Sequence, residues 1–148
     1  ESSAFAVEKA LNLAELNTAS TVYSQHIYAV PKGFYSSGKS YNDFARIMKR
    51  HKSQKFNDFV KRFEGWDTEI VPIYTLDRKN DPTRNIIKTA ESIQADLLVV
   101  GSRGRTRAAA IFLGSFAEKL VQDANEIPLM VVKRKDETLD VIKAIKQL

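Results

Sequence analysis

Three glycines and a serine in the second half of the chain have the spacing of a phosphate-binding loop. The apolar run Leu97–Val100 is followed by Gly101 and Gly104 and, after nine further residues, by Gly114 and Ser115. Glycine at a strand end lets the chain turn sharply and lets a phosphate or ribose approach the backbone without meeting a Cβ atom. A helix that begins at Ser115 would direct its first N–H groups and the positive end of its dipole toward an anion. The spacing Gly-x2-Gly-x9-Gly-Ser therefore predicts a site for nucleotide phosphates.

Cationic side chains and helix amides add to this predicted site. Three arginines lie within residues 102–107, where their charge complements that of phosphates. The N–H groups of the first three helical residues and the Ser115 hydroxyl are further donors. The predicted contacts in this part of the chain are Gly101, Ser102, Arg103, Gly104, Arg105, Gly114, Ser115, Phe116 and Ala117.

A second segment has the literal pattern of a P-loop. Gly33 to Ser40 reads Gly-x4-Gly-Lys-Ser, after a predicted strand and before a predicted helix. Its interior holds the bulky Phe34 and Tyr35, the following helix is highly charged, and no predicted strand ends in the Asp that a P-loop enzyme uses near Mg²⁺. We therefore interpret this segment as a loop that leads into a helix. An NTP hydrolase built on Gly33 to Ser40 is the alternative function.

The composition excludes several classes of chemistry. The 148 residues include no cysteine and only two histidines, His26 and His51, which rules out disulfides, thiol catalysis and zinc-thiolate sites and makes a histidine metal cluster unexpected. No Ser-His-acid set is visible, so no catalytic residue and no metal ligand is predicted, and ATP hydrolysis is expected to be slow at most. No apolar run reaches the length of a membrane span. The lack of cysteine fits a reducing cytoplasm.

The net positive charge of the chain comes from one segment. The net charge is +5, and the segment from Lys39 to Glu64 holds eight Lys and Arg residues against three acidic ones. Phe44, Met48 and Phe56 belong to a set of apolar residues that recur at helical spacing through it. We therefore interpret the segment as an amphipathic helix with a solvated basic face. A basic interaction protein that binds nucleic acid is the alternative.

Apolar periodicity predicts alternating helices and strands. Helical patterns alternate with short runs rich in Val, Ile, Tyr and Thr that have strand character. Such alternation favours right-handed crossovers and a parallel sheet with helices on both faces, which is an α/β fold. In order, we expect a helix over 4–16, a strand over 21–30, a helix over 41–64, a strand over 68–76, a helix over 82–93, a strand over 97–100, a helix from 114 and a strand over 128–133.

The glycine spacing and its flanks resemble the universal stress protein family. Asn85 to Gly101 is similar to the helix and fourth strand of that family, and Gly114 to Lys133 is similar to its last helix and last strand. The resemblance implies an open, doubly wound, mainly parallel five-stranded sheet, Rossmann-like and similar to the adenine nucleotide alpha hydrolases. It implies a nucleotide-binding domain over 1–134 and a C-terminal tail over 135–148 with helical spacing. The first central strand of the family, which ends in an Asp, has no counterpart in the chain. We expect either residues upstream of the numbered chain or another segment to supply it.

The resemblance also implies ligands, contacts and partners. The ligand is ATP, or AMP or ADP, with Mg²⁺ as a further candidate, and the protein is a regulatory or sensor module of the stress response in the cytoplasm. Ile27 matches a position that contacts the adenine, and His26 matches a family histidine that we interpret as a near-core residue rather than a catalytic one. Family members dimerise through their last strands, so a homodimer, or pairing with a tandem domain, is expected through Pro128–Lys133. Nucleic acid and membranes are not among the expected partners.

Overall fold

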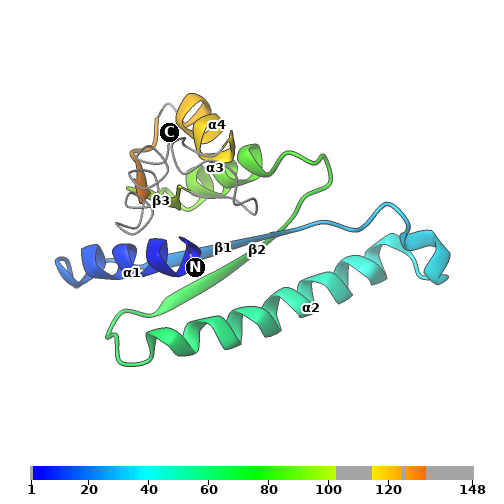
Figure 1. Cartoon of the computed structure of the whole chain (residues 1–148), viewed down its shortest axis with the longest axis horizontal. Coiled ribbons are helices and arrows are strands. Elements are labelled where there is room, and N and C mark those ends of the chain that lie inside the picture. Colours follow the sequence, from blue (N-terminus) through cyan, green and yellow to red (C-terminus); the bar gives the residue numbers. More distant parts are fainter. Residues whose placement is uncertain (1, 103–114, 125, 133–148) are drawn as a thin grey trace, which may run out of the picture. The chain divides into compact units, whose positions relative to one another are not determined.

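A computed structural model of the chain describes residues 2–102, 115–124 and 126–132. The chain divides into two compact units, one made of Glu1–Asn12 and Ile87–Leu148 and the other of Leu13–Ile86. Each unit holds one pair of parallel strands. In chain order the elements are α1 (Ser2–Glu15), β1 (Val22–Tyr28), η1 (Phe34–Ser37), α2 (Tyr41–Val60), η2 (Lys61–Phe63), β2 (Ile70–Leu76), α3 (Pro82–Ser92), β3 (Leu98–Gly101), α4 (Ser115–Asp123) and β4 (Leu129–Val132), as labelled in Figure 1 where there is room.

The unit Leu13–Ile86 is built around β1, β2 and the long helix α2 that connects them. The two strands run parallel in a register that pairs Val22 with Ile70 and Tyr28 with Leu76. Parallel strands need a crossover connection, which α2 provides while packing against both strands. Figure 1 shows α2 running alongside the strand pair. The carboxyl ends of β1 and β2 therefore lie at the same edge of this small sheet.

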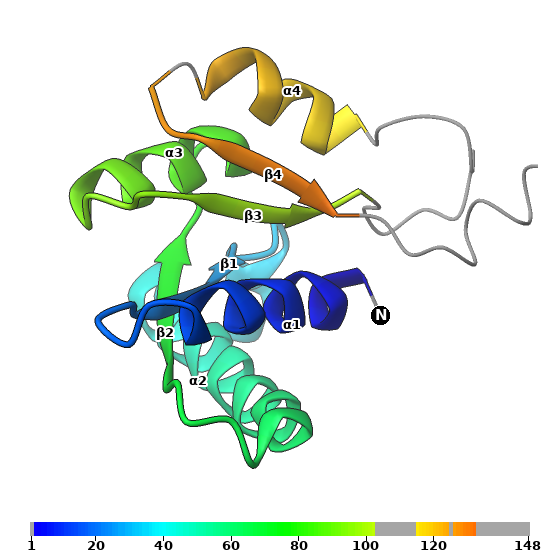
Figure 2. The ribbon, with the colours of Figure 1, turned by 90° about the vertical axis from the view of Figure 1, so that its left-hand side faces the viewer.

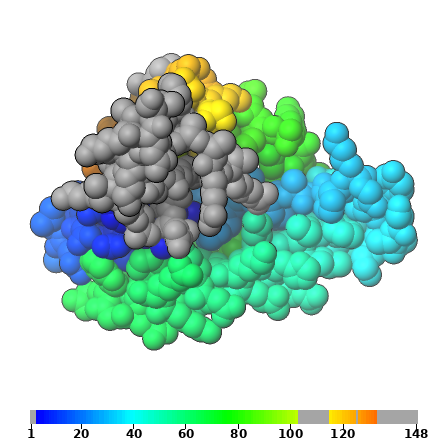
Figure 3. All heavy atoms as spheres, in the orientation of Figure 1, coloured from blue at the N-terminus to red at the C-terminus, as the bar shows by residue number. Residues whose placement is uncertain are grey.

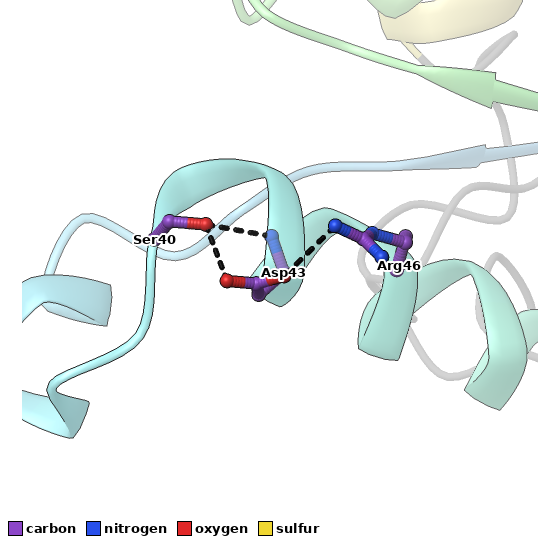
Figure 4. Close-up of polar contacts among 3 residues, drawn as sticks. All are labelled: Ser40, Asp43 and Arg46. Carbon is purple, nitrogen blue, oxygen red and sulfur yellow. Dashed lines mark hydrogen bonds and ion pairs between the residues drawn. The ribbon is translucent and has the colours of Figure 1, made fainter.

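The start of α2 is fixed by Ser40, its N-cap residue. The Ser40 hydroxyl oxygen accepts a hydrogen bond from the Asp43 backbone N–H at 3.1 Å, and the hydroxyl donates to the Asp43 carboxylate at 2.6 Å. The Arg46 guanidinium donates to the other Asp43 carboxylate oxygen at 2.9 Å (Figure 4). Ala45 and Phe56, about three helical turns apart, are buried on the inner side of the helix. A serine followed three residues later by an acidic residue is a helix-start signal, so the local sequence sets where α2 begins.

The other unit holds β3, β4 and α4. The strands run parallel, with Leu98 paired with Leu129 and Gly101 paired with Val132. The helix α4 precedes β4 in the chain and contributes Leu120, which is completely buried. Figure 2 shows β3 and β4 side by side, with α4 beside them. Ala117 and Leu120 form the buried apolar side of α4, and their burial stabilises the helix within this unit.

Helix α3 also has a defined start. The Asp81 carboxylate accepts a hydrogen bond from the Arg84 backbone N–H at 3.2 Å. Pro82 occupies the first helical position, where its missing N–H costs no hydrogen bond.

None of the described helices combines the length and the apolar character that a membrane crossing needs.

The predicted order of helices and strands is confirmed, with shifts at the boundaries. The helix expected over 41–64 ends at Val60 and continues as η2, and the turn after it uses Gly65, whose φ is 105°. The segment expected to be a loop after Val30 contains η1. The described strands form two two-stranded sheets, so the single five-stranded sheet stays a prediction. The tail over 135–148 lies outside the described residues.

Candidate nucleotide-binding site

The end of β3 is held firmly in the sheet. Gly101 is the last residue of β3 and pairs with Val132 in β4. The next residue, Ser102, is only 5% exposed, and its backbone N–H donates to the Val132 carbonyl at 2.8 Å. The chain therefore leaves the sheet directly after a fixed anchor. In α/β sheets, ligands bind outside the carboxyl ends of the strands, which is where Gly101 and Ser102 lie.

The start of α4 faces the same end of this unit. Ser115 is the first residue of α4 and is exposed, whereas Ala117 is 1% exposed and packs inside. The first N–H groups of an α-helix have no acceptor within the helix, and they add to the positive end of its dipole. Figure 2 shows the carboxyl ends of β3 and β4 and the first turn of α4 at one end of the unit. The structure thus brings Gly101 and Ser102 to the same end as Ser115, Phe116 and Ala117.

The remaining predicted contacts are not placed against this end. Arg103, Gly104, Arg105 and Gly114 lie outside the described residues. Ile27 is a half-buried residue of β1, opposite Thr75 of β2, and it belongs to the unit Leu13–Ile86. The roles of these five residues in binding stay predictions.

His26 occupies a packed position between the sheet and α2. Its Nε2 atom lies 3.2 Å from the Ser24 hydroxyl, and its ring contacts those of Phe56 and Tyr74 with centroid distances of 5.2 and 5.7 Å. Burial lowers the pKa of His26 below its ordinary value, and the charge of Lys52 lowers this pKa further. A half-buried imidazole held neutral among aromatic rings agrees with the interpretation of His26 as a near-core residue.

The segment with the P-loop pattern has a different structure from a phosphate-binding loop. A P-loop cradles phosphates with backbone N–H groups that point into one concavity. Here the Ser40 hydroxyl caps α2, and four N–H groups of the segment are used within the turn itself. They are donated from Phe34 to the Pro31 carbonyl at 3.1 Å, from Ser36 to the Gly33 carbonyl at 3.1 Å, from Gly38 to the Tyr35 carbonyl at 3.2 Å and from Lys39 to the Ser37 hydroxyl at 3.3 Å.

One residue at a strand end was missed by the sequence interpretation. Asp77 directly follows β2, which ends at Leu76. Its side chain is buried, and one carboxylate oxygen accepts the N–H groups of Lys79 at 3.2 Å and Asp81 at 3.1 Å. The Asp77 N–H donates to the Tyr28 carbonyl at 2.7 Å. Asp77 thus stabilises the turn between β2 and α3. Asp, Asn and Pro are frequent in turns, so the sequence Asp-x-x-Asn-Asp-Pro that begins at Asp77 could have suggested this role.

No group of three or more His, Asp or Glu side chains in the described ranges could hold a metal ion. The aromatic and cationic residues at the start of α2 form a separate surface, which overlaps the basic segment that begins at Lys39.

Comparison with known proteins shows what the chain is similar to. The sequence profile of the universal stress protein family matches residues 1–133. Universal stress protein MJ0531 of Methanocaldococcus jannaschii is 30% identical over 131 residues, which are 87% of this chain and 74% of that protein. Universal stress protein MJ0577 of the same organism is 27% identical over 119 residues, which are 78% of this chain and 71% of that protein.

Solved structures share the fold. The structure of MJ0577, described as a hypothetical protein whose biochemical function was assigned from its structure, matches with a TM-score of 0.65 and 26% identity, over 86% of this chain and 88% of that one. A universal stress protein in complex with cAMP matches with a TM-score of 0.60 and 20% identity, over 90% of each chain. The α/β architecture expected from the sequence is therefore that of these solved proteins.

Proposed function

Because this chain belongs to the universal stress protein family, we propose that it is an adenine-nucleotide-binding regulatory or sensor module of the stress response, with ATP as its ligand. One observation supports the proposal above all. The anchored strand end at Gly101 and Ser102 and the first turn of α4 at Ser115 lie at the same end of one unit. Backbone N–H groups at such an end bind anions.

The proposed pose places the phosphates at the loop after β3. The N–H groups of Ser115, Phe116 and Ala117 and the Ser115 hydroxyl would donate to phosphate oxygens. The loop arginines Arg103 and Arg105 would add charge, and Ile27 would contact the adenine. AMP and ADP would occupy the same site with fewer phosphate contacts, and Mg²⁺ bound with ATP would be held largely by phosphate oxygens and water. The solved relative that holds cAMP supports an adenine nucleotide on this fold.

We propose further features for the whole protein. Its sheet has the five strands of a doubly wound fold, with one central strand in addition to the four described. The last strand, β4, pairs with β3 along one edge only among the described strands, and its apolar Leu129–Val132 run supports a homodimer or a tandem pairing through Pro128–Lys133. The proposed location is the cytoplasm.

Calorimetry of ATP and AMP binding tests the proposed site. Ser115→Ala removes one donor to a charged phosphate, which is worth about 1.5–3 kcal/mol, or roughly 10- to 100-fold in affinity. We expect Ser115→Ala to weaken ATP more than AMP, and Ser115→Thr, which keeps the hydroxyl, to bind ATP nearly as well as wild type. Ser92→Ala is the matched control, because the Ser92 hydroxyl donates to the Thr89 carbonyl within α3 at 2.8 Å.

Equal ATP affinity in Ser115→Ala and wild type would contradict the proposed pose. Lys39→Ala separates the P-loop alternative from it. A P-loop lysine reaches the β- and γ-phosphates, so its loss would abolish tight binding there. We expect Lys39→Ala to leave the affinity for ATP unchanged.

A further inference from the structure

Aromatic rings and cations gather at the start of α2. Three of them, Lys32, Tyr35 and Lys39, come from the connection between β1 and α2, Tyr41 is the first residue of α2, and Arg78 follows β2. We call these five residues the head patch. Figure 3 shows the atoms of η1 and the first turns of α2, in light blue and cyan, on the visible surface.

The two tyrosine rings of the head patch contact the ring of Phe34. The ring of Phe34 meets those of Tyr35 and Tyr41 edge to face, with centroid distances of 6.0 and 5.5 Å. The Arg78 guanidinium lies 5.2 Å from the centroid of the Tyr41 ring. Tyr35 is nevertheless 72% exposed. An exposed ring that a neighbouring ring holds in place is suited to stack on a planar ligand.

The carboxylates near the head patch are already engaged. Asp43 bonds Ser40 and the Arg46 guanidinium, and Asp77 is buried and accepts two backbone N–H groups. The field of Arg78 reaches the carboxyl end of β1, because it opposes the rise that burial causes in the pKa of Tyr28. Lys32, Lys39 and Arg78 are all exposed to solvent, and the charge of Lys39 also lowers the pKa of the nearby Asp43 carboxyl.

We propose that the head patch binds single-stranded nucleic acid. A base would stack on Tyr35, and the backbone phosphates would meet Lys32, Lys39 and Arg78. An arginine that stacks on an aromatic ring keeps its N–H groups in plane and free to donate to phosphate oxygens. Single strands are bound without sequence preference by this combination of cations and stacking rings. The exposed Arg50 of α2 adds positive charge beyond the head patch, whereas the charge of Arg46 is balanced by Asp43.

A membrane surface fits the head patch less well. Membrane docking uses aliphatic or aromatic anchors that enter the acyl boundary. The exposed large aliphatic side chains of the described residues, Leu13, Leu16, Leu97 and Val121, belong to other segments of the chain. Among the exposed large apolar side chains, Tyr35 alone belongs to the head patch. A single tyrosine surrounded by cations favours a nucleic-acid strand.

Fluorescence anisotropy with the full chain and a labelled single-stranded RNA of about 12 nucleotides tests this proposal. We expect Tyr35→Ala to weaken binding roughly 5- to 100-fold, the range of a lost base stack, and Tyr35→Phe to restore it. Lys39→Ala should lower the slope of log affinity against log salt by about 0.7, the value for one phosphate contact on a single strand.

Two control variants match these substitutions. Tyr23→Ala removes another exposed tyrosine, the second residue of β1, which is 47% exposed. Lys55→Ala removes an exposed lysine about 21 Å along α2 from Tyr41. Both should bind the RNA as wild type does.

The outcomes separate this proposal from the proposed function. Tyr35→Ala with wild-type RNA affinity, an equal loss in Tyr23→Ala, or Tyr35-dependent binding to anionic phospholipid vesicles without RNA binding would each overturn the proposal. Because the ATP site is proposed at α4, Tyr35→Ala should bind ATP as wild type does, and Ser115→Ala should bind RNA as wild type does. Loss of ATP binding in Tyr35→Ala would instead assign the ring to a mononucleotide site and overturn single-strand binding.

Discussion

Replacing Ser40 by alanine should destabilise the protein without changing the proposed nucleotide site. The structure gives the Ser40 hydroxyl one task, which is to cap α2 by accepting the Asp43 N–H and donating to the Asp43 carboxylate. The hydrogen bond from Ser40 is also the main cause that lowers the pKa of Asp43, with the charge of Arg46 as a smaller cause. In Ser40→Ala the Asp43 N–H would lose its side-chain acceptor, and the pKa of Asp43 would rise.

The expected size of the effect follows from the capping geometry. Removing a serine N-cap costs about 1 kcal/mol, within a range of about 0.5–2 kcal/mol. Asp43 stays in the first turn, where its charge still favours the positive end of the helix dipole, so the loss should lie near the middle of that range. For a chain of this size, 1 kcal/mol lowers the melting temperature by about 2–4 °C.

Urea unfolding followed by circular dichroism measures this change. Ser40→Ala should lower the unfolding midpoint with the same urea dependence as wild type. Ser40→Asp keeps a good N-cap residue and should retain most of the stability, and Lys39→Ala, one position outside the helix, should unfold as wild type does. A Ser40→Ala variant that is as stable as wild type but has lost ATP affinity would refute the capping role and favour a phosphate-binding loop at Gly33 to Ser40.

Two further predictions concern the unit Leu13–Ile86. The pKa of His26 lies below its ordinary 6.5 in the folded protein, so the unfolded chain takes up the proton first. The stability that neutral His26 contributes is therefore complete above about pH 6.5 and is lost as the pH falls below it. Between about pH 7.5 and pH 5.5, urea midpoints of wild type should drop further than those of His26→Gln, and parallel curves would show the sign to be wrong. Gly38 has a φ of 70°, so Gly38→Ala should lower the free energy of unfolding by about 1–2 kcal/mol in the same assay. Gly33 has a φ of −91° and open space around it, so Gly33→Ala should lower it little. Equal losses in the two variants would rule out backbone strain at Gly38 as the cause.

The order of the elements was predictable because each is specified by its own residues. Val, Ile and Tyr are frequent in β1 and β2, which indicates strands. Ser40 and Pro82 are residue types that are typical of helix starts, and α2 and α3 begin there. The residues at which the helices end were less predictable. The last turn of the helix expected to reach Glu64 tightens into η2, since a 3-10 turn often closes a helix.

The candidate site was predictable only where chemistry follows from spacing along the chain. Gly101 and Ser115 were expected at a strand end and a helix start, and both are there. The contact of Arg78 with Tyr41 joins residues far apart in the sequence, and no local pattern encodes it. The turn residues from Asp77 to Pro82 are visible in the sequence, but the burial of the Asp77 carboxylate and its two backbone hydrogen bonds are not. Ring contacts and buried turns need the three-dimensional arrangement that the chain adopts as a whole.

The most direct test of the central claim is the affinity for ATP of a Gly114→Val variant, measured by calorimetry beside wild type and Gly33→Val. In the proposed site, Gly114 would permit close approach of phosphate to the backbone, which a β-branched side chain would block. Gly33 belongs to the competing motif, and a Cβ atom there would meet nothing within 4 Å, so its valine variant is a fair control. We predict that wild type and Gly33→Val bind ATP equally and that Gly114→Val binds at least about tenfold more weakly, a loss of about 1.4 kcal/mol. Equal affinity of Gly114→Val and wild type, or a loss confined to Gly33→Val, would contradict nucleotide binding at the loop between β3 and α4.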